Sequence, residues 1–125
     1  MVQHYQLYDI TYDVWVFSLN GKQYKIKMSG NRAANDGDLV RRWCVAGKGV
    51  AVKSCLDMSA DLLSGKVVSL MPEFKHPQTE LWLVFPNRQS ITPATRLLRD
   101  MLGVKTKGVL NQLIEKGVLD NRVLT

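Results

Sequence analysis

The chain has 125 residues, of which 46% are hydrophobic and 22% are charged, and it carries a formal net charge of +6. This length and composition are typical of one globular domain with a single core. No apolar run approaches the ~20 residues of a membrane span, and residues 1–10 lack the basic and apolar regions of a secretory signal, so we expect neither membrane insertion nor export.

The first predicted element is a β-hairpin. Residues 12–18 and 23–28 both alternate apolar and polar side chains, as strands with one buried face do. Asn20-Gly21 lies between them, and this dipeptide readily adopts the positive φ that a type I′ turn needs at both central positions. The alternation places the lysines of the second strand on the face opposite its apolar residues, in contact with water.

An amphipathic helix is predicted next. Asn35 and Asp36 suit its N-cap, and Gly47 suits the left-handed position just after its last turn. Arg41 and Arg42 are expected on its solvated face. Its apolar stripe consists of Leu39, Val40, Trp43 and Cys44.

The remaining elements alternate between helix and strand. Asp57 and Asp61 are expected on the solvated face of the predicted 54–64 helix. The alternation implies an α/β layer with some parallel strand pairing. The expected elements are a strand at 50–52, a helix at 54–64 capped by Ser54, strands at 66–71 and 80–86, a helix from Pro93 to Gly103 capped by Thr92, and a helix at 106–116.

Few residues suggest catalytic or metal chemistry. The stretch "AGKGVAV" at 46–52 has the residue types of a phosphate-binding loop, but it follows a predicted helix and precedes a strand, the reverse of the order that such loops need. His4 and His76 have no carboxylate partner at a characteristic spacing. Cys44 and Cys55 lack the spacing of a metal site or a disulfide framework and favour a reducing cytoplasm. We therefore expect no enzyme activity, no metal and no other cofactor.

The start of the helix near Asn35 is the strongest candidate for contact with a ligand. Free backbone N–H groups and the positive end of a helix dipole readily bind carboxylate, sulfate or phosphate. The alternative is that Asp36 and Asp38 satisfy those donors themselves, so that the segment is only a cap. The residue pattern leaves both alternatives open.

Several segments, taken in order, resemble the effector-binding domain of LysR-type transcriptional regulators. They are Trp15-x-Phe17 with its Asn-Gly turn, the Asn35-Asp36 helix start, Gly47-x-Gly49-Val50-Ala51, Asp61-Leu62-x-x-Gly65-Lys66-Val67-Val68-x-Leu70-x-Pro72, and Leu83-Val84-x-Pro86 before a terminal helix. His4-x-x-Leu7 is similar to the start of the family's second regulatory subdomain. The resemblance covers residues 4–102 and implies an α/β, periplasmic-binding-protein-like (type 2) fold, in which two Rossmann-like subdomains enclose a small molecule.

The resemblance also implies a division of the chain. Residues 1–79 resemble the second regulatory subdomain, and 80–102 resemble the strand and helix that return to the first one. Residues 103–125 are expected to form a C-terminal helix and tail beyond the family pattern. The family's helix-turn-helix domain and most of its first subdomain have no counterpart here, so we expect an incomplete fold and no direct DNA binding by this chain.

The apolar stripe of the predicted 93–102 helix would lack the cover that the first subdomain gives it in the family. Burying such a stripe is worth several kcal/mol at ~25 cal/mol/Å². We therefore expect self-association as a dimer, or cover by the 106–116 helix. The stripe consists of Ala94, Leu97, Leu98, Met101 and Leu102.

These features predict an effector-sensing and dimerisation fragment of a LysR-type regulator, located in the cytoplasm. Its ligand is expected to be small and anionic, and the resemblance implies contact at Ala34, Asn35, Asp36 and Gly37. One alternative is a protein-interaction module that pairs with full-length regulators or with itself and has no ligand. A second is nucleic-acid binding, which only the charge of +6 favours, since the basic residues are scattered.

Overall fold

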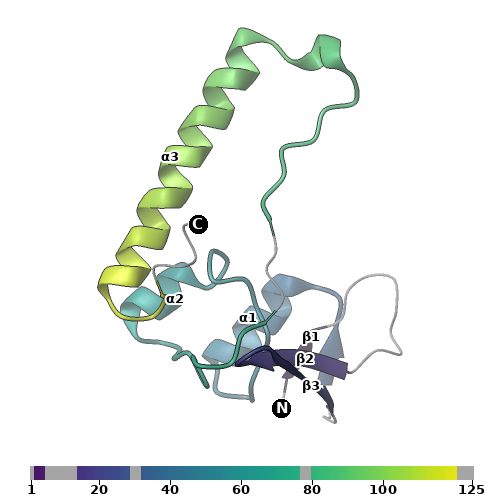
Figure 1. Ribbon diagram of the computed structural model, residues 1–125, viewed down its shortest axis with the longest axis vertical. Helices are drawn as coiled ribbons and strands as arrows, with labels where there is room; N and C mark the ends of the chain where they lie inside the picture. Colours follow the sequence, from purple (N-terminus) through teal and green to yellow (C-terminus); the bar gives the residue numbers. More distant parts are fainter. Residues whose placement is uncertain (1, 5–13, 29–31, 77–79, 121–125) are drawn as a thin grey trace. The chain divides into compact units, whose positions relative to one another are not determined.

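The chain forms two compact units, Met1–Pro77 and Gln78–Thr125. The computed structural model describes residues 2–4, 14–28, 32–76 and 80–120. Within these residues the first unit contains short strands and two helices, and the second contains a 3-10 turn and one long helix (Figure 1). No helix in these segments is both long enough and apolar enough to cross a membrane.

The predicted hairpin is confirmed. Strands β2 (Val14–Leu19) and β3 (Lys22–Lys27) pair antiparallel, and Asn20 and Gly21 join them with φ values of 51° and 78°. These positive φ values are those of a type I′ turn, whose twist matches that of the flanking strands. The two-residue turn therefore fixes the register of the pair.

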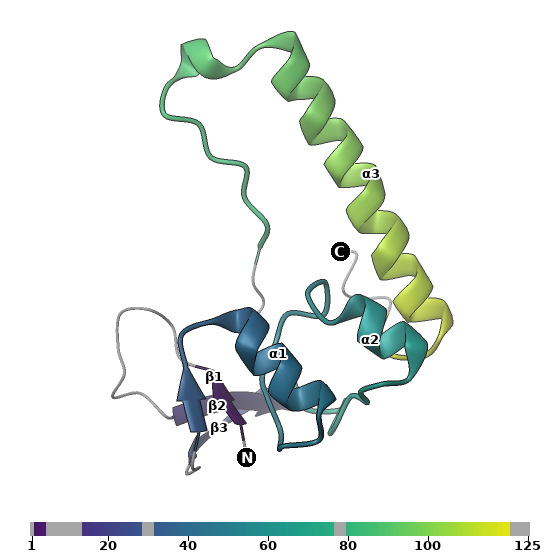
Figure 2. The ribbon, with the colours of Figure 1, turned by 180° about the vertical axis from the view of Figure 1, so that it is seen from behind.

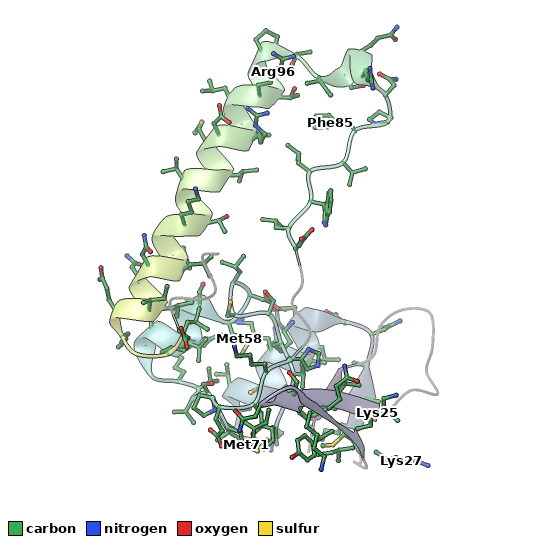
Figure 3. All side chains as sticks on the ribbon, in the orientation of Figure 1. Lys25, Lys27, Met58, Met71, Phe85 and Arg96 are labelled. Atoms are coloured by element: carbon green, nitrogen blue, oxygen red, sulfur yellow. The ribbon has the colours of Figure 1, made fainter. Side chains whose placement is uncertain are left out.

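The predicted difference between the two faces of the hairpin is confirmed only in part, because every residue of β3 is exposed, including Ile26 at 47%. Trp15 pairs with Ile26, and Trp15 is buried. Lys25 and Lys27 lie on the other face and are exposed (Figure 3). Lys75 joins the free edge of β2, where its backbone exchanges hydrogen bonds of 2.7 and 2.8 Å with Ser18.

A parallel strand pair accompanies the hairpin. Strand β1 (Val2–His4) pairs with β4 (Arg32–Ala34), so that Val2 lies opposite Arg32 and His4 opposite Ala34. The general expectation of parallel pairing is therefore confirmed, although neither strand was predicted individually. Helix α1 (Gly37–Val45) packs against both strands, and Figure 2 shows the chain passing from the blue strand β4 directly into α1.

Both predicted ends of α1 are confirmed. Asp36 is its N-cap. At the other end Gly47 has a φ of 71°, and its N–H donates to the Cys44 carbonyl at 3.0 Å. The N–H of Lys48 donates to the Trp43 carbonyl at 3.0 Å, which completes a Schellman motif. A glycine in this position ends the helix and satisfies its last carbonyls.

Three predicted strands are absent from the described residues, and one predicted helix is shorter. Segments 50–52, 66–71 and 80–86 have no ladder partner, and a strand without one is not assigned. Met71 has a φ of 51° and accepts a hydrogen bond from the N–H of Phe74 at 3.0 Å, so the chain turns where the second strand was expected to finish. Most of the large apolar side chains in 66–71 and 80–86 are also exposed, so these apolar runs predicted neither a ladder partner nor burial.

Helix α2 (Ser59–Ser64) replaces the helix expected at 54–64. Its N-cap is Met58, which makes no side-chain capping bond, so the prediction of Ser54 as the cap is wrong. Residues 55–58 form turns before the helix begins.

The prediction of a solvated Asp61 is also wrong. This residue is only 2% exposed, and its carboxylate accepts two hydrogen bonds from Arg41, from Nε at 2.6 Å and from a terminal nitrogen at 3.0 Å. Arg41 is therefore drawn partly out of solvent too. Val40 of α1 and Met58, the N-cap of α2, are buried, so the ion pair joins the two helices beside apolar side chains.

The second unit is dominated by helix α3 (Pro93–Glu115), which corrects the prediction of two separate helices. Thr92 and Thr95 form a capping box at its start, as the Thr-Pro pair suggested. Gly103 does not end the helix, and Figure 1 shows α3 continuing through it without a break. Because the two predicted segments are one rod, the second cannot fold back to cover the first.

Candidate functional site

The predicted ligand contact lies at the carboxyl end of the parallel strand pair. Ala34 is the last residue of β4 and lies opposite His4, the last residue of β1. Asn35 and Asp36 follow, and α1 begins at Gly37. Ligands of α/β folds characteristically bind at this edge, beyond the carboxyl ends of parallel strands and at the start of a helix.

The Asp36 side chain occupies part of the helix N-terminus. Its Oδ1 accepts hydrogen bonds from the backbone N–H groups of Asp38 at 2.9 Å and Leu39 at 3.3 Å. These are two of the donors that an anion would otherwise use. The structure thus gives Asp36 the role of an N-cap, the alternative that the sequence left open.

Asn35 is an exposed polar residue directly before this cap. Its side chain is exposed, whereas Ala34 and Gly37 are half-buried. An exposed amide can both donate and accept hydrogen bonds. The four predicted residues are therefore contiguous at one place, with Asn35 as their free side chain.

Lys53 also lies at the start of α1, and the sequence analysis did not single it out. Its Nζ donates to the Gly37 carbonyl at 3.0 Å and forms an ion pair with Asp57. The Lys53 side chain is only 9% exposed. A sequence cue existed, because Lys53 directly follows the apolar run 50–52 and precedes Asp57 by four residues. The result is a Lys53–Asp57 ion pair whose ammonium reaches the residue next to the cap.

Further charges on α1 are neutralised locally. The Asp38 carboxylate lies 2.9 Å from Arg42 Nε and 3.7 Å from a terminal nitrogen of Arg41. Hydrogen bonding and attraction to Asp61 raise the pKa of Arg41 above its ordinary value, so Arg41 stays charged. These pairs leave the carboxylate of Asp36 as the main negative charge beside Asn35.

The two cysteines show no sign of reactivity. Burial raises the pKa of the Cys44 thiol, and the nearby Asp61 carboxylate raises it further. Burial likewise raises the pKa of Cys55. Reactive cysteines have lowered pKa values. Within 14–28, 32–76 and 80–120, no three His, Cys, Asp or Glu side chains come together as a possible metal site.

The predicted self-association stripe is exposed to solvent along α3. Leu97, Leu98, Met101 and Leu102 are all exposed, and Val104 extends the apolar surface toward the middle of the helix. Ala94 is exposed at its start. Large apolar side chains that gather on one exposed surface characteristically mark an interaction site.

Comparison with known proteins places the chain in a family. Residues 8–105 match the LysR substrate binding domain. The chain belongs to this family. Family membership implies a periplasmic-binding-protein-like fold, and the mixture of helices and strands described above is consistent with it.

Curated relatives of this LysR-family chain include regulators and a shorter protein, all from Escherichia coli strain K12. The HTH-type transcriptional regulator DmlR is 30% identical over 94 residues, which are 75% of this chain and 30% of DmlR. The HTH-type transcriptional activator TtdR is 31% identical over 62% of this chain and 24% of TtdR. The LysR-family substrate-binding-domain protein YagP is 31% identical over 69% of this chain and 63% of YagP.

The matched region is thus less than a third of each regulator, DmlR and TtdR, and nearly two thirds of YagP. No solved structure matches this LysR-family chain.

Proposed function

We propose that this chain is the effector-sensing and dimerisation part of a LysR-type transcriptional regulator, that it acts in the cytoplasm, and that it catalyses no reaction. The observation that carries the proposal is the match of residues 8–105 to the LysR substrate binding domain. The relatives DmlR and TtdR are named as transcriptional regulators, which favours a regulatory role over an enzymatic one. Residues 1–79 form the second regulatory subdomain in this proposal, and 80–102 belong to the first.

The proposed effector is a small anion that contacts the Ala34–Gly37 segment. The position of this segment beyond parallel strands and at a helix start supports such a contact. The ammonium of Lys53 lies near the helix start but is already paired with Asp57, so the proposed contact depends on the backbone N–H groups and the Asn35 amide. The Asn35 amide donates a hydrogen bond to the anion, and Asp36 holds the helix start in place as its cap.

Dimerisation is proposed to use the exposed stripe on α3. Leu98 and Met101 lie near its centre, one turn apart, and both are exposed. Association of two copies removes this apolar surface from water. An isologous dimer with a two-fold axis is the commonest way to do so.

A second candidate function is a protein-interaction module without a ligand. YagP favours this alternative. The aligned region makes up 63% of YagP but only 30% of DmlR, so YagP is a much shorter protein than DmlR. Short chains therefore occur among the relatives. In this alternative the chain pairs with itself or with a full-length regulator, and the Asp36 cap leaves no room for an anion.

Isothermal titration calorimetry distinguishes the two candidates. We would titrate the chain with acetate, succinate, citrate, sulfate and phosphate. Effector sensing predicts saturable binding of at least one of these anions and an affinity at least tenfold lower in Asn35→Ala, because a hydrogen bond to a charged group is worth ~1.5–3 kcal/mol. Asn111→Ala, an exposed asparagine on α3, is the matched control and should bind as the parent does. No binding, or equal affinity in Asn35→Ala, would favour the interaction module.

A further inference from the structure

Lys53 is a buried lysine whose ammonium contacts the backbone at the start of α1. Its side chain is only 9% exposed, and its Nζ donates to the Gly37 carbonyl at 3.0 Å. The second partner of the ammonium is the carboxylate of Asp57, whose side chain is 46% exposed. Burial of a charged group is costly unless the group is paired and hydrogen-bonded. The two contacts therefore fix the ammonium at this place.

The Gly37 carbonyl belongs to the same peptide group as the Asp38 N–H. Asp36 Oδ1 accepts a hydrogen bond from that N–H at 2.9 Å. The trans peptide group is planar, so its carbonyl and its N–H point in opposite directions. The group is thus held on both sides, by Lys53 at its oxygen and by Asp36 at its nitrogen.

This peptide group sets the geometry of the helix start. Gly37 is the first residue of α1, and its own N–H makes no hydrogen bond within the described part of the chain. Glycine has no side chain that restricts its backbone, so a contact at its carbonyl limits the directions in which the neighbouring N–H groups point. A hydrogen bond to the carbonyl also polarises the N–H of the same peptide group.

We propose that Lys53 is a positioning residue for the anion contact and acts through the Gly37–Asp38 peptide group. Its ammonium does not touch the anion. It holds and polarises the backbone that presents the N–H groups of the helix start. This inference rests on the proposed function, because it concerns the anion contact at Ala34–Gly37, and it adds a residue that lies outside that segment.

The competing role for Lys53 is simple attraction between its charge and the anion. The Lys53–Asp57 pair has no net charge. The double variant Lys53→Met, Asp57→Asn also leaves the net charge unchanged, because it removes one positive and one negative charge. Attraction by net charge therefore predicts the affinity of the parent in this double variant, whereas positioning through the backbone predicts weaker binding.

Calorimetry of the full chain measures the difference, with acetate, succinate, citrate, sulfate and phosphate as probes in about 0.15 M sodium chloride, which screens distant charges. Lys53→Met and the double variant should both bind the parent's preferred anion about threefold or more weakly, as is typical of residues that act through others. Lys48→Met is the matched control, because it removes an exposed lysine just beyond the other end of α1, and it should bind as the parent does.

The carbonyl carbon resonance of Gly37 reports the hydrogen bond itself. A carbonyl carbon moves downfield when its oxygen accepts a hydrogen bond, so NMR of the isotope-labelled, anion-free chain should show this resonance upfield in Lys53→Met and unchanged in Lys48→Met. A role of Lys53 in stability alone would lower the melting temperature without lowering the anion affinity of the folded chain. An unshifted Gly37 resonance in Lys53→Met would overturn the proposal.

Asp57→Asn provides a second variant if Lys53→Met does not fold. It leaves Lys53 in place with the Gly37 carbonyl as a partner, and it changes a residue that is nearly half exposed. The Gly37 resonance should stay downfield, and the anion affinity should equal or exceed that of the parent. Weaker binding in Asp57→Asn would contradict positioning through Gly37.

The outcomes separate this inference from the proposed function. If the parent binds one of the five anions and the double variant binds it equally well, effector sensing stands and the role of Lys53 is wrong. If the parent binds none of them, both proposals fail.

Discussion

At the scale of single residues, the Arg41–Asp61 pair is the main polar contact between α1 and α2. Asp61 is 2% exposed and receives both Arg41 hydrogen bonds, of 2.6 and 3.0 Å. Two parallel N–H···O bonds fix the relative orientation of both side chains, which a lysine cannot do. The pair therefore sets how the two helices meet.

We predict that Asp61→Asn and Arg41→Lys each lower the melting temperature, Asp61→Asn by about 5 °C or more, because a buried partner is left incompletely satisfied. The double variant Arg41→Met, Asp61→Leu should recover most of the loss, since replacing both charges by apolar groups removes the need for pairing. Thermal unfolding followed by circular dichroism measures both. Unchanged stability in Asp61→Asn would show that the pair is not important.

Asp36 supplies a second prediction at this scale. Asp36→Ser keeps an N-cap oxygen but removes one negative charge beside the proposed anion contact. Anion affinity should rise severalfold, because repulsion at this range is worth about 1 kcal/mol or more. Calorimetry with sulfate measures the change, and weaker binding in Asp36→Ser would place the anion elsewhere.

The cysteine thiols give a pH-dependent prediction. Burial raises the pKa of Cys44 and Cys55 in the folded chain, whereas unfolding returns each to its ordinary value. The folded state therefore loses stability as the pH rises above ~8.5, and alkylation at pH 8 should be slower in the folded chain than in urea. Iodoacetamide labelling followed by mass spectrometry measures this. Equal rates with and without urea would contradict it.

At the scale of elements, α3 runs through two glycines that could have ended it. Gly103 and Gly108 lie inside the helix, and an added Cβ at either would meet no atom within 4 Å. The helix ends at Glu115 instead, and Gly117 follows with a φ of 77°. The sequence predicted helix ends at Gly103 and after residue 116; the second is confirmed and the first is wrong, because glycine alone marks a possible end and only its φ decides.

Substitution by alanine should therefore have opposite effects at two glycines. Gly103→Ala is expected to stabilise the chain by about 0.5–1 kcal/mol, because alanine loses less backbone entropy in a helix. Gly117→Ala should destabilise it, because alanine disfavours positive φ. Urea unfolding measures both changes. A destabilised Gly103→Ala would indicate that α3 breaks there in solution.

Local patterns predicted some elements well and failed at others for physical reasons. The Asn20-Gly21 turn and the Asp36 and Thr92 caps each depend on neighbouring residues alone, and all three are confirmed. A strand depends on a partner that may be far away in the sequence, so the apolar runs at 66–71 and 80–86 were misassigned. Lys53 was missed for a similar reason, because its contact with Gly37 spans 16 residues.

At the scale of the whole molecule, the two units carry different proposed tasks. The first unit, Met1–Pro77, contains the Asn35 contact, and the second, Gln78–Thr125, contains the exposed stripe. Effector sensing and dimerisation can therefore be tested by separate variants.

Titration of the full, isotope-labelled chain with the anion that binds most tightly, followed by NMR, tests the central proposal of effector sensing most directly. We predict saturable shifts of the backbone amide resonances of Ala34, Asn35 and Gly37, and none at exposed residues of α3 such as Asn111. The Asn35→Ala chain should need at least ten times more anion for the same shifts. Shifts that never saturate, or that lie outside the start of α1, would contradict the account.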